Sequence, residues 1–195
     1  MELTEHSVWI LPALELNLCL QMLGAGERQV LPVAETDTPL DHRMLNSFLY
    51  LLELGLVETE GARFRPSEKL RRRLEPVASP RQILRLGDGT EFVLAAYLGE
   101  DAITLAEVQG EDGQSCRLSA VTPAELAEAL ERLPEKLEPE KLQLELLDRE
   151  GQSLLSEPLP PETERRREAI RSVLEKAELP EQKEEKPAES GITEE

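Results

Sequence analysis

The feature that most constrains the fold is a set of four short segments in which apolar and polar side chains alternate with the period of a strand. These segments span residues 82–86, 91–98, 102–109 and 114–120. Short glycine-rich turns separate them, and connections of this kind join antiparallel neighbours. The sequence therefore predicts a four-stranded antiparallel meander.

The second predicted strand is apolar on both of its faces. One face carries Phe92, Leu94 and Ala96, and the other carries Val93, Ala95 and Tyr97. A strand with one solvated face would carry polar residues at alternate positions. We therefore expect other elements to cover both faces of the sheet.

Apolar residues before and after this region recur with helical spacing. We expect helices over residues 7–23, 41–54, 67–77 and 122–133. Ser67 supplies a cap for the third, and Thr122-Pro123-Ala124-Glu125 is a capping box for the fourth. Residues 56–65 read as a short hairpin. The predicted class is α+β: N-terminal helices with a short winged-helix-like hairpin, then the meander covered by helices.

The character of the chain changes near residue 134. We predict an α+β domain over 1–134, a hairpin or linker over 135–160 and an amphipathic helix over 161–179. The last segment, 180–195, has almost no apolar side chains and many glutamates and lysines. Such a segment buries too little apolar surface to fold, so we predict a disordered acidic tail.

Acidic residues dominate the composition. The 195 residues include 40 Asp and Glu against 22 Lys and Arg, a net charge of −18. This charge repels nucleic acid phosphates and anionic lipids over most of the surface. No uncharged run reaches the roughly 18 residues of a membrane span, and the N-terminus lacks the basic start of a signal peptide. We therefore expect a cytoplasmic protein without membrane contact, for which nucleic acid is a disfavoured partner.

The residues that usually carry catalysis are sparse. The two histidines and two cysteines lack the spacing of a zinc site, and Cys116 lies within a predicted strand rather than at a nucleophile turn. Cys19 and Cys116 are interpreted as two free buried thiols, with a disulfide as the alternative. Phosphate-loop and dinucleotide-binding motifs are missing from the sequence. We expect no catalytic residue, no metal and no cofactor, and hence no enzyme.

One segment is basic. Between residues 63 and 85, eight basic residues stand against two acidic ones, a local charge of +6. The basic patch within this segment consists of Arg63, Arg65, Lys69, Arg71, Arg72 and Arg73. In a winged-helix interpretation, residues 41–54 are the recognition helix and 56–64 the wing. That helix is mostly apolar and has few side chains to read bases. We favour a patch paired with acidic groups, and keep a winged-helix DNA-binding transcriptional regulator as the alternative.

Several stretches occur in a distinctive order: Glu2-Leu3-Thr4 before Trp9, Gly24-Ala25-Gly26 before Leu31-Pro32, Leu54-Gly55-Leu56-Val57, Phe64-Arg65-Pro66, residues 89–97, Ala102-Ile103-Thr104-Leu105, Cys116-Arg117-Leu118 and Leu133-Pro134. Over residues 2–134 this order resembles one half-repeat of the EspG-type chaperones of type VII secretion. The resemblance implies a cytosolic chaperone with an antiparallel sheet and helices, which binds a secretion substrate at an exposed end. Residues placed at that end would be Gly87, Asp88, Gly89, Thr90, Glu111, Asp112 and Gln114.

The chain departs from that family in having one half instead of two. A homodimer would restore the second half, and the two apolar faces of the 91–98 strand motivate this idea. Our leading hypothesis from the sequence is a non-catalytic cytoplasmic adaptor or chaperone. Its partner would be a protein client, specifically a type VII secretion substrate.

Overall fold

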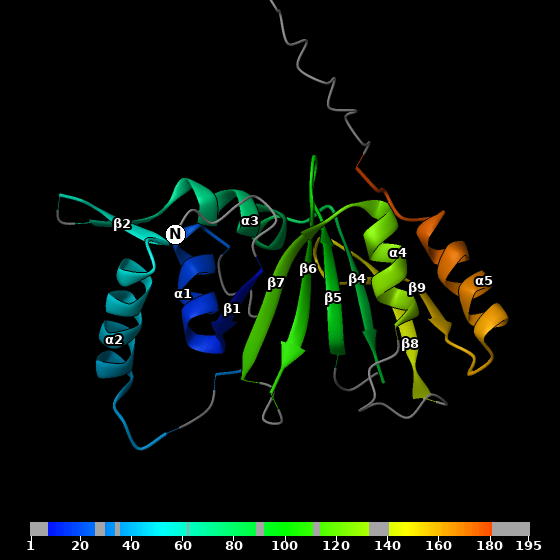
Figure 1. Ribbon diagram of the computed structural model, residues 1–195, viewed down its shortest axis with the longest axis horizontal. Helices are drawn as coiled ribbons and strands as arrows, with labels where there is room; N and C mark the ends of the chain where they lie inside the picture. Colours follow the sequence, from blue (N-terminus) through cyan, green and yellow to red (C-terminus); the bar gives the residue numbers. More distant parts are fainter. Residues whose placement is uncertain are drawn as a thin grey trace, which may run out of the picture.

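The computed structural model describes residues 8–25, 30–33, 36–61, 63–88, 92–110, 114–132 and 141–180. In chain order the elements are β1 (Trp9–Pro12), α1 (Ala13–Met22), α2 (Leu40–Glu53), β2 (Val57–Glu60), β3 (Arg63–Pro66), α3 (Glu68–Ala78), β4 (Gln82–Gly87), β5 (Phe92–Leu98), β6 (Ile103–Gln109), β7 (Ser115–Val121), α4 (Pro123–Glu131), β8 (Gln143–Asp148), β9 (Ser153–Pro158) and α5 (Thr163–Leu174). Figure 1 shows α1, α2 and α3 at one end of a large sheet and α4 and α5 at the other. The predicted α+β class is confirmed.

The large sheet has seven strands in the order β1-β7-β6-β5-β4-β8-β9, and every neighbouring pair is antiparallel. The predicted four-stranded meander is therefore wrong as a description of this sheet. The three additional strands, β1, β8 and β9, join the sheet through pairings between distant parts of the chain. β8 aligns Asp148 with Gln82 and Gln143 with Gly87, which adds the β8–β9 hairpin beside β4.

The first helix begins later than predicted, because residues 9–12 form the edge strand β1. In this strand Trp9 and Leu11 are buried, whereas Ile10 is exposed, so the burial follows the period of a strand. Pro12 has no backbone N–H, and it biases the preceding residue towards an extended conformation. The helix starts at Ala13, whose backbone N–H donates to the carbonyl oxygen of Gln114 over 2.8 Å.

Two hydrophobic cores lie on opposite faces of the sheet. On one face Ala95 and Tyr97 of β5 join buried residues of α1, α2 and α3. On the other, Leu94 and Ala96 join buried residues of α4 and α5. The expectation that both faces of this strand are covered is confirmed. The chain's own helices provide the cover, so the apolar faces no longer call for a second copy.

Local capping chemistry sets the helix starts. The Ser67 hydroxyl accepts from the backbone N–H of Leu70, and Thr122 and Glu125 form the complete capping box. The C-terminal helix ends at Leu174, earlier than the predicted 179, and it packs on α4 and β9. The predicted disordered segment lies, from residue 181 onward, outside the described residues.

Candidate functional site

Helix α2 stands at one end of the molecule and packs against α1 (Figure 1). Its buried face is narrow, with Ser47 and Leu51 as its buried residues. The Ser47 hydroxyl donates to Glu15 Oε1 over 2.7 Å, which fixes α2 on α1. Most of the remaining circumference of α2 is open to solvent.

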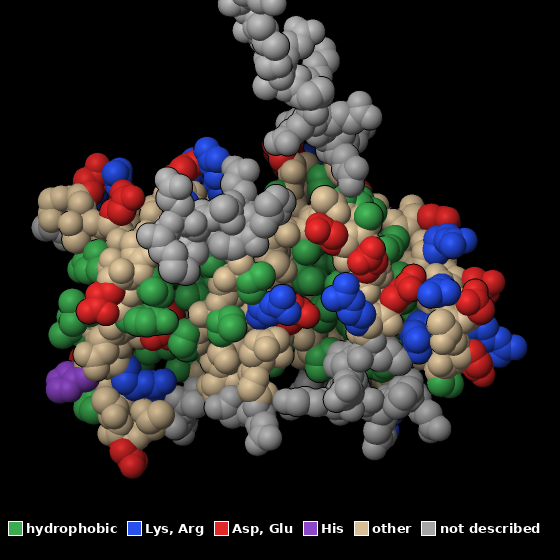
Figure 2. Space-filling model, in the orientation of Figure 1, with side chains coloured by type: hydrophobic (Ala, Val, Ile, Leu, Met, Phe, Trp, Pro, Cys, Tyr) green, Lys and Arg blue, Asp and Glu red, His purple; other side chains and the backbone are tan. Residues whose placement is uncertain are grey.

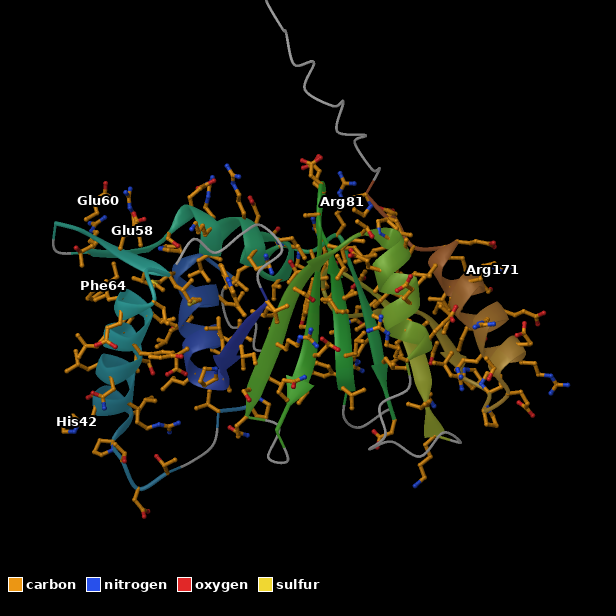
Figure 3. The ribbon with its side chains drawn as sticks, in the orientation of Figure 1. His42, Glu58, Glu60, Phe64, Arg81 and Arg171 are labelled. Atoms are coloured by element: carbon orange, nitrogen blue, oxygen red, sulfur yellow. The ribbon has the colours of Figure 1, made fainter. Side chains whose placement is uncertain are left out.

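That open side carries an unusual amount of apolar surface. Leu45 is 58% exposed and Leu49, one helical turn later, is 51% exposed. Phe48 stacks on Phe64 of β3, with 4.9 Å between ring centroids and 16° between ring planes, and Phe64 is 44% exposed. We call Leu45, Phe48, Leu49, Leu52 and Phe64 the α2 surface. Figure 2 shows hydrophobic side chains gathered over this end, and Figure 3 shows Phe64 between the hairpin and α2.

Charged residues border the α2 surface. Asp41 and Glu53 are exposed near the two ends of α2. On the hairpin, Arg65 pairs with both Glu58 and Glu60, at N–O distances of 3.2 and 3.4 Å. Residues 36–66 hold five acidic and three basic side chains, so the border is acidic overall.

Within the predicted basic patch, three arginines form ion pairs with glutamates and a fourth is buried. Arg65 is engaged by the two hairpin glutamates. On α3, Arg71 and Arg72 both pair with Glu68, over 3.1 and 3.0 Å. Hydrogen bonds from Arg72 and Arg71 lower the pKa of Glu68. Arg63 lies on β3 and Lys69 on α3, and both are exposed.

The last member of the patch, Arg73, is buried and structural. It is 8% exposed, and its guanidinium carbon lies 5.2 Å from the centroid of the Trp9 ring. Its Nη1 donates to the carbonyl oxygen of Leu118 over 3.4 Å. Burial lowers the pKa of Arg73. A guanidinium held in this way is not available to a phosphate.

Three of the loop residues implied by the resemblance are described by the structure: Gly87, Asp88 and Gln114. The end of β4 and the start of β7 lie at the same end of the sheet, because β4 to β7 are consecutive antiparallel neighbours. Gly87 is buried, and Asp88 and Gln114 are half-buried. Gly89, Thr90, Glu111 and Asp112 lie outside the described residues. Their role in binding stays a prediction.

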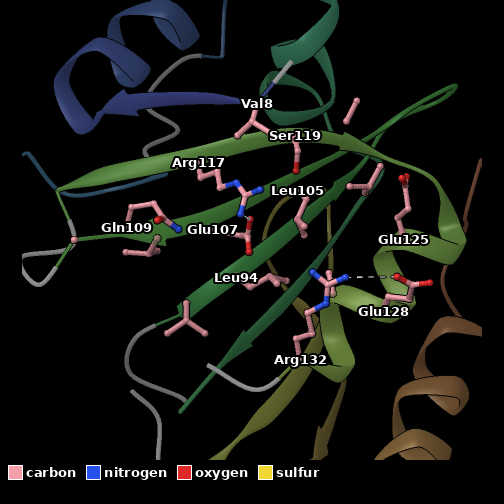
Figure 4. A pocket seen from close by; sticks show the side chains of 16 residues that line it. Val8, Leu94, Leu105, Glu107, Gln109, Arg117, Ser119, Glu125, Glu128 and Arg132 are labelled. Carbon is pink, nitrogen blue, oxygen red and sulfur yellow. Dashed lines mark ion pairs between the residues drawn. The ribbon is translucent and has the colours of Figure 1, made fainter. Parts of the chain in front are cut away.

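A groove of about 710 Å³ lies over β6 and β7 beside α4 (Figure 4). Its floor includes Leu94 and Leu105, each 4% exposed. Glu107 and Arg117 pair across the floor at 3.4 Å, and Glu128 pairs with Arg132 on α4 at 3.5 Å. Glu125, on the same wall, belongs to the capping box. Two of the three acids that line the groove are paired with its two arginines, so the groove has a small net negative charge.

The two thiols are unreactive by position. Cys19 and Cys116 are free and buried, as predicted, and burial is the main cause that raises the pKa of each to about 12. Nearby Glu15 and Glu107 raise them further. Among the described residues, no group of three or more His, Cys, Asp or Glu is placed to hold a metal ion. Within the same part of the chain, no helix is long and apolar enough to cross a membrane.

No protein-family model matches the sequence, and no curated protein matches it.

The α2 surface was not predicted from the sequence. The sequence of residues 41–54 predicts one apolar helix side, formed by Met44, Phe48, Leu51 and Leu52. The positions of Leu45 and Leu49 could have indicated this surface, because neither residue lies on the helix face of Ser47 and Leu51. Leu45 and Leu49 adjoin Phe48 and Leu52 around the helix, so they widen the apolar stripe beyond the side that packs on α1. The uncovered part of that stripe is available to a second partner.

Proposed function

We propose that this protein is a non-catalytic adaptor or chaperone that binds a protein client through the α2 surface. The observation that carries the proposal is the exposure of Leu45, Leu49 and Phe64 at one end of the molecule. Contiguous exposed apolar side chains typically mark interaction sites, since burying them contributes about 25 cal/mol per Å². Partner binding would remove these side chains from water.

The proposal extends to the class of client. The order of motifs that resembles the EspG-type chaperones supports a type VII secretion substrate, bound in the cytoplasm before export. The α2 surface would cover an apolar segment of that substrate. The net charge of −18 would keep the complex soluble through repulsion between complexes.

The geometry argues against the winged-helix alternative. The helix that would enter the major groove is α2, and much of its exposed surface is formed by Leu45 and Leu49, with His42 and Asn46 as the exposed polar side chains that could contact bases. Arg71 and Arg72, which would contact phosphates, are engaged by Glu68. A mobility-shift assay at low salt tests this point. Sequence-dependent DNA retention that is lost in Arg71→Ala/Arg72→Ala would overturn the proposed function.

The decisive experiment is co-expression with candidate type VII secretion substrates. The double variant Leu45→Ser/Leu49→Ser removes the apolar ridge from a solvent-exposed face. The matched control is Leu154→Ser, because Leu154 is 55% exposed on β9 at the other edge of the sheet. We expect the wild type and the control to co-elute with a substrate on size exclusion, and the double variant to lose it.

Retention of the substrate by the double variant would contradict the proposal. Both variants change exposed residues, so each should keep the helical circular dichroism signal of the wild type. That measurement separates loss of binding from loss of folding.

A further inference from the structure

We infer that the segment bound by the α2 surface is an amphipathic helix whose apolar stripe is flanked by lysine or arginine. The inference rests on the proposed function and specifies the partner of the same surface. It also states what the partner is not: a second copy of this chain.

The shape of the α2 surface favours a helix. Leu45 and Leu49 are four positions apart in the helix, so they form one ridge along α2. The stacked Phe48 and Phe64 rings form a second wall beside that ridge. Side chains of one helix pack as ridges between the ridges of another. The 14 residues of α2 offer about 21 Å of length, which is three to four turns of a partner helix.

The charges near the ridge favour basic flanks. Asp41 precedes Leu45 by one turn and Glu53 follows Leu49 by one turn, and both acids are exposed. Arg43 lies about 200° around the helix from Leu45, on a different side of α2. A helix placed along the ridge therefore meets a carboxylate at each end. Lysine or arginine beside its apolar stripe would pair with these carboxylates.

The same two acids disfavour a second copy as the partner. A two-fold antiparallel pairing centred between Leu45 and Leu49 places Asp41 of each copy beside Glu53 of the other. A parallel pairing places each acid beside its own equivalent. Either arrangement brings like charges together at the rim of the contact, which opposes association.

Synthetic peptides of the length of α2 test the inference on the full chain. The first peptide carries a leucine stripe with lysine flanks, the second the same stripe with glutamate flanks, and the third the composition of the first in scrambled order. Fluorescence anisotropy gives each affinity. We expect the first peptide to bind at least about tenfold more tightly than either of the others.

Three variants locate the effect. Leu45→Ser/Leu49→Ser should abolish binding of the first peptide, and the control Leu154→Ser should preserve it. Asp41→Asn/Glu53→Gln should keep binding and reduce the preference for lysine over glutamate flanks to about twofold or less.

Several results would overturn the inference. They are equal binding of the lysine and glutamate peptides, equal binding of the scrambled peptide, or a wild-type dimer in sedimentation velocity that Leu45→Ser/Leu49→Ser abolishes. If a secretion substrate still requires Leu45 and Leu49 in any of these cases, the proposed function stands and only the helical, basic partner is wrong. If the substrate binds the double variant, the proposed function fails independently of the peptide results.

Discussion

Single residues in this protein act mainly through burial. Cys19 and Cys116 sit in the core that α1 shares with β7, and burial there favours the neutral thiol over the charged thiolate. Both cysteines, which the sequence predicts to be free buried thiols, are thus structural. The exposed leucines of α2 are the functional candidates.

The raised thiol pKa values predict a loss of stability at high pH. Each thiol has a pKa of about 12 in the fold, against 9.0 ordinarily, so between these values the unfolded chain releases protons that the folded chain retains. The contribution of each thiol is complete below pH 9.0 and falls by about 1.4 kcal/mol per pH unit above it. Urea unfolding of the wild type and of Cys116→Ala at pH 8 to 11 measures it.

The wild type should lose stability more steeply than Cys116→Ala over this range. Tyrosines and lysines titrate in both proteins, so the difference between the slopes isolates the thiol. Parallel slopes would show that Cys116 does not resist ionisation in the fold.

Among the elements, α3 shows how a helix is fixed to the sheet by one polar residue. Arg73 covers the ring of Trp9 in β1 and donates to the Leu118 carbonyl in β7. Its own carbonyl accepts from the Thr104 hydroxyl of β6 over 2.7 Å. One residue thereby joins α3 to three strands.

Replacing this residue should destabilise the whole fold. In Arg73→Met the apolar stem is kept, but the cation over the indole and the donor to Leu118 are lost. We expect the free energy of unfolding to fall by about 1 to 3 kcal/mol. Arg72→Met is the matched control, since Arg72 is on the same helix and its pairing is at the surface. Equal effects of the two changes in urea unfolding would contradict a docking role for Arg73.

The elements that were predictable depend on nearby residues. The capping box at Thr122, the cap at Ser67 and the alternating segments of β4 to β7 carry their own local signals, so their places could be inferred. β1 could not, because its four residues are strand only through pairing with β7, more than 100 residues away. The exposure of the α2 surface could not be predicted for the same reason, because tertiary packing decides which leucines of α2 are covered by α1.

At the scale of the whole molecule, two cores share one sheet. The helices of each core cover opposite faces at opposite ends, and β5 contributes to both. Neither core is complete without the strands that the other also uses. The two faces should therefore unfold together.

The single tryptophan makes this cooperativity measurable. Trp9 lies in the core of α1, α2 and α3, so its fluorescence reports on that face alone. Leu126→Ala, in the opposite core, should cost about 2 to 5 kcal/mol. We expect it to shift the Trp9 transition and the circular dichroism transition equally. A Trp9 transition that stays in place would indicate two independent units.

The two outer strands of the sheet have a consequence for aggregation. β1 and β9, at its edges, both end in proline, Pro12 and Pro158. Proline cannot donate a main-chain hydrogen bond, and it hinders a strand of another molecule from adding to an edge. Each edge therefore offers only a short ladder of main-chain groups to an extended segment of another chain, which disfavours growth of the sheet by strand addition.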